Sequence, residues 1–286
     1  MNPSQIQQIY AESNHALVDG GFSAFYQAQL ACFLRYCPDF NYQDFSQETG
    51  RAVRPIQSMK TLLAYNACYS ADHFARFQYL LSHVQNLSSE VITDPIRLCV
   101  FDYGCGQGLA TLALLGHLKG RQVELIIHLI EPSALALASA QQYVQAFAGS
   151  MHGQVTVHAY QCGLDQIPDH VFSLPEGYSA VHLFSNVLDL AHRRLFDLSC
   201  LATQLNRIVG KHICFAVSPT FYSGKLGFDQ LKYFFKPSRM LVDQEICNIP
   251  VVGYRCDKRM LVPHNANGRF LAFVRCVSHI DRLKVA

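Results

Sequence analysis

The chain has 286 residues, of which half are hydrophobic and 15% are charged, and its formal net charge is +2. This composition is typical of a globular protein with a large core and excludes a disordered chain. A charge so close to balance, with no basic run, gives no argument for a nucleic-acid partner.

The longest apolar stretches are interrupted well before the ~20 residues that cross a bilayer. The first residues lack the basic and apolar regions of a signal peptide. We therefore expect no membrane association and a cytoplasmic location. The eleven cysteines are an odd number without a C-x-x-C pair. We interpret them as small buried residues in a reducing compartment and predict no metal site, although distant Cys and His residues could still assemble one.

Residues 1–93 show helical rather than strand periodicity. Apolar residues recur at helical spacing in 22–37 and in 70–84, where Ser70 or Asp72 is placed to cap the second helix. The polar stretch 41–56 predicts a loop. We predict an N-terminal helical cap over 1–93, a junction near 87–95, and a second domain over 94–286.

From residue 96 onward, strand-like and helix-like segments alternate. The predicted strands are 98–103, 123–130, 155–160, 180–185 and 212–217. The predicted helices are 109–118, 133–148 (with Ser133 as its N-cap) and 190–205. Asn267-Gly268 stands between strand-like residues 259–262 and 270–277 and predicts a hairpin. The predicted fold class is α/β, with a mostly parallel, doubly wound seven-stranded sheet and a C-terminal antiparallel hairpin.

A glycine-rich turn follows the first strand, in the order Asp102-Tyr103-Gly104-Cys105-Gly106-Gln107-Gly108. Glycine lets backbone N–H groups approach a ligand closely because it has no Cβ. A dinucleotide fingerprint reads G-x-G-x-x-G. Here the third glycine comes one residue early, and Leu109 stands where that pattern needs glycine. The spacing therefore disfavours a nicotinamide-dependent oxidoreductase, which stays as an alternative.

Polar or small residues follow the other predicted strands as well. These strand ends are Glu131-Pro132, Gln161-Cys162, Ser185-Asn186 and Ser218-Pro219. Ligands of open parallel sheets bind beyond the carboxyl ends of the strands. The sequence therefore predicts one site built from several separate segments.

The stretch Val100–Gly108 resembles the first motif of class I S-adenosylmethionine-dependent methyltransferases, an acidic residue followed by G-x-G-x-G. The resemblance covers about residues 96–280 and implies a Rossmann-like fold with S-adenosylmethionine as cofactor. It implies that Glu131 accepts hydrogen bonds from the ribose hydroxyls, that Gln161 and Cys162 meet the adenine edge, and that Ser185 and Asn186 lie under the methionine part. The cofactor-binding residues expected on this basis are Asp102, Tyr103, Gly104, Cys105, Gly106, Gly108, Glu131, Pro132, Gln161, Cys162, Ser185 and Asn186. The segment 218–222, together with the helices ahead of the sheet, also resembles bacterial methyltransferase-like proteins related to ribosomal small-subunit methyltransferases.

Methyl transfer from a sulfonium needs in-line approach and exclusion of water rather than a nucleophile from the enzyme. The family's Asn/Asp-Pro-Pro-Tyr/Phe stretch is absent, since Asn186 is followed by Val187-Leu188-Asp189. Asn186 and Asp189 are the candidates to orient the acceptor, and either could instead cap a helix. The acceptor (RNA, protein or small molecule) and the oligomeric state stay open. The alternative is a non-catalytic S-adenosylmethionine-binding interaction protein of the same fold.

Two further residue types have a structural interpretation. Cys105 precedes a predicted helix, where a thiolate would be stabilised, but tight packing is the favoured role. His128, His158 and His182 fall within predicted strands, and we interpret them as structural residues.

Overall fold

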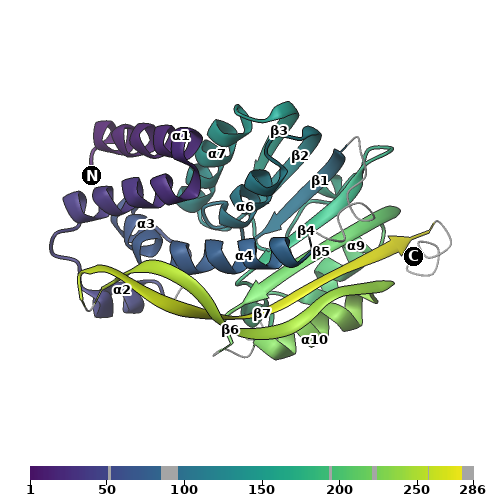
Figure 1. Ribbon diagram of the computed structural model, residues 1–286. Helices are drawn as coiled ribbons and strands as arrows, with labels where there is room; N and C mark the ends of the chain where they lie inside the picture. The colour runs from purple at the N-terminus through teal and green to yellow at the C-terminus, as the bar shows by residue number, and fades with distance from the viewer. Residues whose placement is uncertain (51–52, 85–95, 193–194, 221–223, 257, 279–286) are drawn as a thin grey trace.

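The computed structural model describes the chain except residues 51–52, 85–95, 193–194, 221–223, 257 and 279–286 (Figure 1). The elements ahead of the sheet are α1 (Pro3–Tyr36), α2 (Tyr42–Glu48), α3 (Met59–Tyr65), the π-helix η1 (Asn66–Ser70) and α4 (Ala71–Val84). The strands are β1 (Ile96–Tyr103), β2 (Gln122–Ile130), β3 (His152–Tyr160), β4 (Ser179–Ser185), β5 (Gly210–Ser218), β6 (Arg239–Arg255) and β7 (Met260–Val277). The later helices are α6 (Leu109–Leu118), α7 (Ala134–Ala148), the 3₁₀ turn η3 (Asp169–Phe172), α8 (Leu188–His192), α9 (Leu198–Leu205) and α10 (Gly224–Phe235).

The seven strands form one sheet in the order β3-β2-β1-β4-β5-β7-β6. The first five strands are parallel, and β7 runs antiparallel to both β5 and β6. The predicted fold class is therefore confirmed. The chain order of the strands reverses between the neighbouring strands β1 and β4. The carboxyl ends of these two strands are therefore the topological switch point, where α/β sheets bind ligands.

Alternate side chains of β1 enter two separate cores. Leu98 and Val100 pack on the face covered by α1, α3, α4, α6 and α7, whereas Phe101 and Tyr103 pack on the face covered by α8, α9 and α10. The central strands β1, β4 and β5 are buried on both faces, so they read as continuous apolar runs in the sequence.

The N-terminal helices pack directly on the first of these faces. In Figure 1, α1 lies beside α7, and α4 crosses the sheet near β7. Helix α1 changes direction at Gly21, whose φ of 68° favours glycine. One continuous core runs from Ile9 of α1 to Val100 of β1. The predicted junction near 87–95 lies outside the described residues, as do Phe221 and Tyr222 of the 218–222 segment.

The predicted hairpin at Asn267-Gly268 is wrong, because both residues lie inside β7, where Gly268 pairs with Ile246. Strand β6 instead ends at Arg255, and β7 begins at Met260. Packing explains this glycine: a Cβ on Gly268 would come within 2.5 Å of the Phe270 ring. A glycine in a strand interior thus marks a close contact here rather than a turn.

Three helix predictions are also corrected. The predicted loop 41–56 contains α2, which Asn41 caps by accepting from the Gln43 amide. The predicted helix 190–205 is divided into α8 and α9, and Asp197 caps α9. Neither Ser70 nor Asp72 caps a helix, because η1 continues into α4 without a break. By contrast, Ser133 caps α7 as predicted, accepting from the Ala136 amide.

None of the helices in the described part of the chain has the length and apolar character that a membrane crossing requires. Among the same residues, no group of three His, Cys, Asp or Glu side chains is arranged to hold a metal ion.

Candidate ligand site at the switch point

A cavity of about 340 Å³ lies at the carboxyl ends of β1, β2 and β4. Six of the residues predicted from the sequence line it: Gly104, Gly106, Glu131, Pro132, Ser185 and Asn186. Three separate strand ends therefore meet at one space, as expected for the switch point of a doubly wound sheet.

The glycine turn has a backbone shape that other residues adopt only with strain. Gly104, Gly106 and Gly108 have φ values of 61°, 53° and 77°. A Cβ on Gly104 would come within 2.6 Å of Val187, whereas a Cβ on Gly106 would meet no atom within 4 Å. Gly106 therefore borders open space in the cavity wall.

Glu131 follows β2 and is held by the backbone on both carboxylate oxygens. Its Oε2 accepts from the Gly106 N–H at 3.0 Å, and its Oε1 accepts from the Ser133 N–H at 3.0 Å. Burial raises the pKa of Glu131, while these two N–H groups act to lower it. A carboxylate has about four acceptor positions, so each oxygen keeps one for a ligand.

Asp102 lies beneath the glycine turn and does not line the cavity. Its Oδ2 accepts from the Thr111 N–H at 3.3 Å and from the Thr111 hydroxyl at 2.7 Å, which ties β1 to α6. Its Oδ1 is buried and has no hydrogen-bond partner. Burial raises the pKa of Asp102 to about 7, and the Thr111 hydrogen bonds only partly oppose this.

Tyr103, Cys105 and Gly108 also lie outside the cavity wall. Burial raises the pKa of the Cys105 thiol, which disfavours a thiolate and supports the packing interpretation. Gly108 allows the close approach of α7, since a Cβ there would come within 3.0 Å of Val144.

The Tyr103 hydroxyl belongs to a buried hydrogen-bonded chain that crosses three strands. It contacts His182 Nδ1 at 3.0 Å, His182 Nε2 contacts His212 Nδ1 at 2.9 Å, and His212 Nε2 contacts the Ile208 carbonyl at 2.8 Å. Burial lowers the pKa of both histidines. Because the Ile208 carbonyl can only accept, the neutral histidines each donate from Nε2, and Tyr103 donates to His182. This arrangement agrees with a structural role for His182.

The remaining predicted residues are placed at the margin of the site. Gln161 and Cys162 do not line the cavity, whereas the next two residues, Gly163 and Leu164, do. Asp189 lies in the first turn of α8 and does not line the cavity.

Asn186 has an uncommon backbone conformation, with a φ of 60°. Its side-chain amide donates to the Ser185 hydroxyl at 3.0 Å, and its backbone N–H donates to the Val217 carbonyl at 2.9 Å. Its Oδ1 is buried without a hydrogen-bond partner.

The N-terminal segment supplies cavity residues that the sequence did not indicate. These are Val53, Arg54, Pro55, Ile56 and Tyr65. The Ser133 hydroxyl donates to the Ile56 carbonyl at 2.6 Å, which fixes this segment beside Glu131. Residues 53–56 have no regular secondary structure and lie far from the glycine turn in the sequence, so no local sequence pattern indicates that they reach the cavity.

Tyr65 is the polar aromatic residue of the cavity wall. Burial raises the pKa of its hydroxyl, and the charges of Glu131 and Asp189 raise it further. Tyr65 therefore keeps its proton at neutral pH, so its hydroxyl can donate a hydrogen bond but cannot serve as a base.

A buried polar network connects the N-terminal helices to the glycine turn. The Asn66 amide donates to Gln107 Oε1 and to Gln29 Oε1, and Gln29 also donates to the Tyr143 hydroxyl at 2.8 Å. The Ser70 hydroxyl donates to Asn66 Oδ1 at 2.7 Å. Elements α1, η1, α7 and the cavity wall are therefore joined by hydrogen bonds through residues that water does not reach.

No family model and no curated protein matches the chain by sequence. Several solved structures that are similar to it are described as methyltransferases. A class I S-adenosylmethionine-dependent methyltransferase from Listeria monocytogenes, described as putative, has 13% identity and a TM-score of 0.42, over 96% of this chain and 87% of its own. The CurJ carbon methyltransferase has 15% identity and a TM-score of 0.44, over 96% and 71%. The plantazolicin methyltransferase BamL, solved with S-adenosylhomocysteine, has 11% identity and a TM-score of 0.40, over 94% and 98%. These values are too low to assign the chain to a family.

Fold and cavity together define the chain as a doubly wound α/β protein with a cavity at its switch point.

Proposed function

We propose that the chain binds S-adenosylmethionine in the switch-point cavity and transfers its methyl group to an acceptor. One observation carries this proposal: Glu131 faces the cavity with a free acceptor position on each carboxylate oxygen, beside the glycine turn. Two vicinal hydroxyl donors, as in a ribose, match such a carboxylate.

The residues present fit this cofactor in size and chemistry. A volume of about 340 Å³ lies within the range of small-molecule sites. The open space beside Gly106 admits a ligand against the backbone. Asp102 supports the turn from beneath through Thr111. Gly163 and Leu164 line the cavity and directly follow Gln161 and Cys162, the residues that the resemblance places at the adenine edge.

When bound, S-adenosylmethionine supplies an electrophilic methyl group, so the chain's own residues need only position the acceptor and exclude water. We propose that the acceptor lies between the N-terminal helices and the strand ends. Tyr65 would donate a hydrogen bond to it and Asn186 would orient it, whereas Asp189 does not line the cavity and would not contact the acceptor there. The class of acceptor (RNA, protein or small molecule) stays open.

Calorimetric titration of S-adenosylhomocysteine into the purified chain tests binding, with NAD as the matched dinucleotide control. We expect saturable binding of the first ligand alone. Absence of binding at millimolar concentration, or preferential binding of NAD, would overturn the proposal.

A second experiment separates the enzyme from a non-catalytic binding protein. The chain is incubated with methyl-labelled cofactor and separate RNA, protein and small-molecule fractions of a lysate. Transfer into one fraction supports the enzyme and identifies the class of acceptor. Cofactor binding without transfer into any fraction favours the non-catalytic alternative.

A further inference from the structure

A second cavity, of about 770 Å³, lies between the N-terminal elements and the long β6–β7 pair. Two cysteines that are 188 residues apart in the sequence meet in the wall of this cavity. They are Cys68 of η1 and Cys256, which follows β6. Their sulfur atoms are 2.6 Å apart. Both side chains are partly exposed, so a small reagent in the cavity can reach them.

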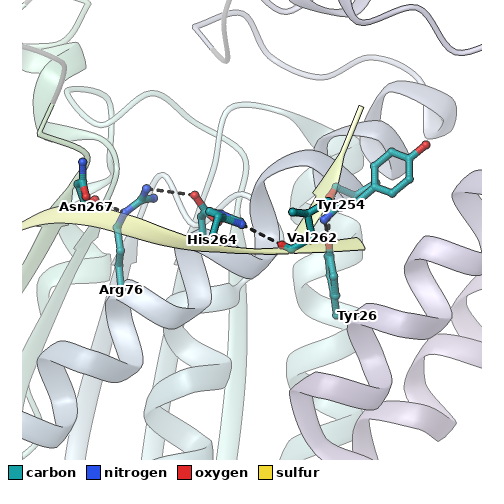
Figure 2. A network of polar contacts seen from close by, with 8 residues as sticks. Tyr26, Arg76, Tyr254, Val262, His264 and Asn267 are labelled. Atoms are coloured by element: carbon teal, nitrogen blue, oxygen red, sulfur yellow. Dashed lines mark hydrogen bonds and ion pairs between the residues drawn. The ribbon is translucent and has the colours of Figure 1, made fainter. Parts of the chain in front are cut away.

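The backbone around both cysteines is held in place by one tyrosine. The Tyr26 hydroxyl donates to the carbonyl of Ala67 at 2.8 Å and accepts from the N–H of Tyr254 at 2.9 Å. Ala67 is the neighbour of Cys68, and Tyr254 lies two residues before Cys256. Figure 2 shows Tyr26 directed to Tyr254 from the helix below. The approach of the two sulfurs is therefore part of a fixed interface.

Helix α4, which continues directly from η1, is anchored to the β6–β7 pair at two further points. Asp72 contacts His264 Nε2 at 2.8 Å. Arg76 Nε donates to the Asn267 carbonyl at 2.6 Å (Figure 2). Cys68, Asp72 and Arg76 follow at four-residue spacing and all line the second cavity. Cys68 thus occupies the first of three successive contacts with the β6–β7 pair.

We propose that Cys68 and Cys256 form a reversible disulfide that links η1 to the end of β6. A low-molecular-weight disulfide such as oxidised glutathione supplies the oxidising equivalents. The thiolate of one cysteine attacks it, forms a mixed disulfide and releases one glutathione thiolate. The second cysteine then attacks the protein sulfur and releases the other glutathione. Two protein thiols are oxidised, one small disulfide is reduced to two thiols, and two protons pass to the released thiolates.

The bond would act on the segment that also borders the switch-point cavity. Tyr65 lines that cavity and Asn66 holds Gln107 of the glycine turn, only two or three residues before Cys68. The hydrogen bond with the Cys256 sulfur and burial raise the pKa of Cys68. Oxidation is therefore expected to be slow at neutral pH and to accelerate as the pH rises, because the thiolate is the attacking species.

The test equilibrates the full chain at graded ratios of oxidised to reduced glutathione, followed by peptide mapping and thermal unfolding. We expect a linked pair of peptides carrying Cys68 and Cys256, reversal by excess reductant, and a rise in the melting temperature of about 5–10 °C on oxidation, because the bond closes a long loop. Cys256→Ser should show neither the linked peptides nor the rise in melting temperature. Under reducing conditions, this variant and the unchanged chain should have the same melting temperature.

Cys247→Ser is the matched control, since Cys247 is an exposed cysteine of β6, the strand that precedes Cys256. It should retain the linked peptides and the rise in melting temperature. The proposal is overturned if the linked pair is absent at every ratio. It is equally overturned if Cys256→Ser gains the same thermal stabilisation on oxidation.

Discussion

The side-chain amide of Asn66 donates a hydrogen bond to Oε1 of Gln107, and both residues are buried. Asn66 belongs to η1, and Gln107 lies between two glycines of the turn that borders the switch-point cavity. The helices ahead of the sheet are therefore hydrogen-bonded directly to the turn that borders the candidate ligand site. This contact makes the N-terminal segment part of the site rather than an appendage to it.

Substitution of Gln107 tests that coupling. Gln107→Ala leaves the Asn66 amide buried without one of its acceptors, which should lower the free energy of unfolding by about 1–3 kcal/mol. Urea denaturation measures the change. Gln8→Ala is the control, because Gln8 bonds to Glu12 on an exposed face of α1. An effect as small as that of the control would show that the buried contact contributes little.

Glu131→Gln tests the proposed ribose contact. The amide nitrogen of glutamine would face a backbone donor, and the charge-assisted acceptor would be lost. We expect S-adenosylhomocysteine affinity to fall by about 10- to 100-fold, which corresponds to ~1.5–3 kcal/mol. Glu176→Gln, at an exposed position, should leave affinity unchanged. Equal affinities of both variants in calorimetry would remove Glu131 from the binding site.

Gly106→Ala separates backbone strain from obstruction of the cavity. Gly21 offers a matched control, since both glycines have positive φ and neither Cβ would meet an atom within 4 Å. Alanine should cost about 1–3 kcal/mol of stability at either position through its strained backbone, and the larger cost is expected at Gly21, whose ψ of −161° is essentially restricted to glycine. Only the Gly106 variant should also weaken S-adenosylhomocysteine binding, because only Gly106 lines the cavity. Unchanged ligand affinity in Gly106→Ala would contradict the proposed position of the ligand.

Protonated Asp102 should stabilise the folded chain, and this stabilisation should be lost as the pH rises. Its pKa is raised in the folded state to about 7, from 3.8. The folded state therefore binds this proton more tightly than the unfolded state does. The resulting stability is complete below pH 3.8 and lost as the pH approaches 7, by about 3 kcal/mol between pH 5 and pH 8.

Asp102→Asn removes this titration while leaving an oxygen acceptor for Thr111. The stability of the unchanged chain relative to the variant should therefore fall between pH 5 and pH 8, as measured by urea denaturation at each pH. A difference that stays constant over this range would show that Asp102 does not titrate there.

The sequence alone determined the alternation of strands and helices after residue 96. The reason is local: apolar runs, the Ser133 cap and a glycine turn with positive φ at three positions are properties of neighbouring residues. The same local logic identified Glu131 and Asn186 at strand ends, which parallel pairing brings to one edge.

The tertiary structure alone decided which residues complete the site. Tyr65 and Arg54 reach the cavity, and Asn66 reaches Gln107, only because α1, η1 and α4 pack on the sheet. The Asn267-Gly268 pair shows the converse, since its glycine serves the Phe270 ring and not a turn. Contacts between residues far apart in the chain depend on packing against surfaces that no local pattern encodes. For the same reason, the meeting of Cys68 and Cys256 is visible only in the fold.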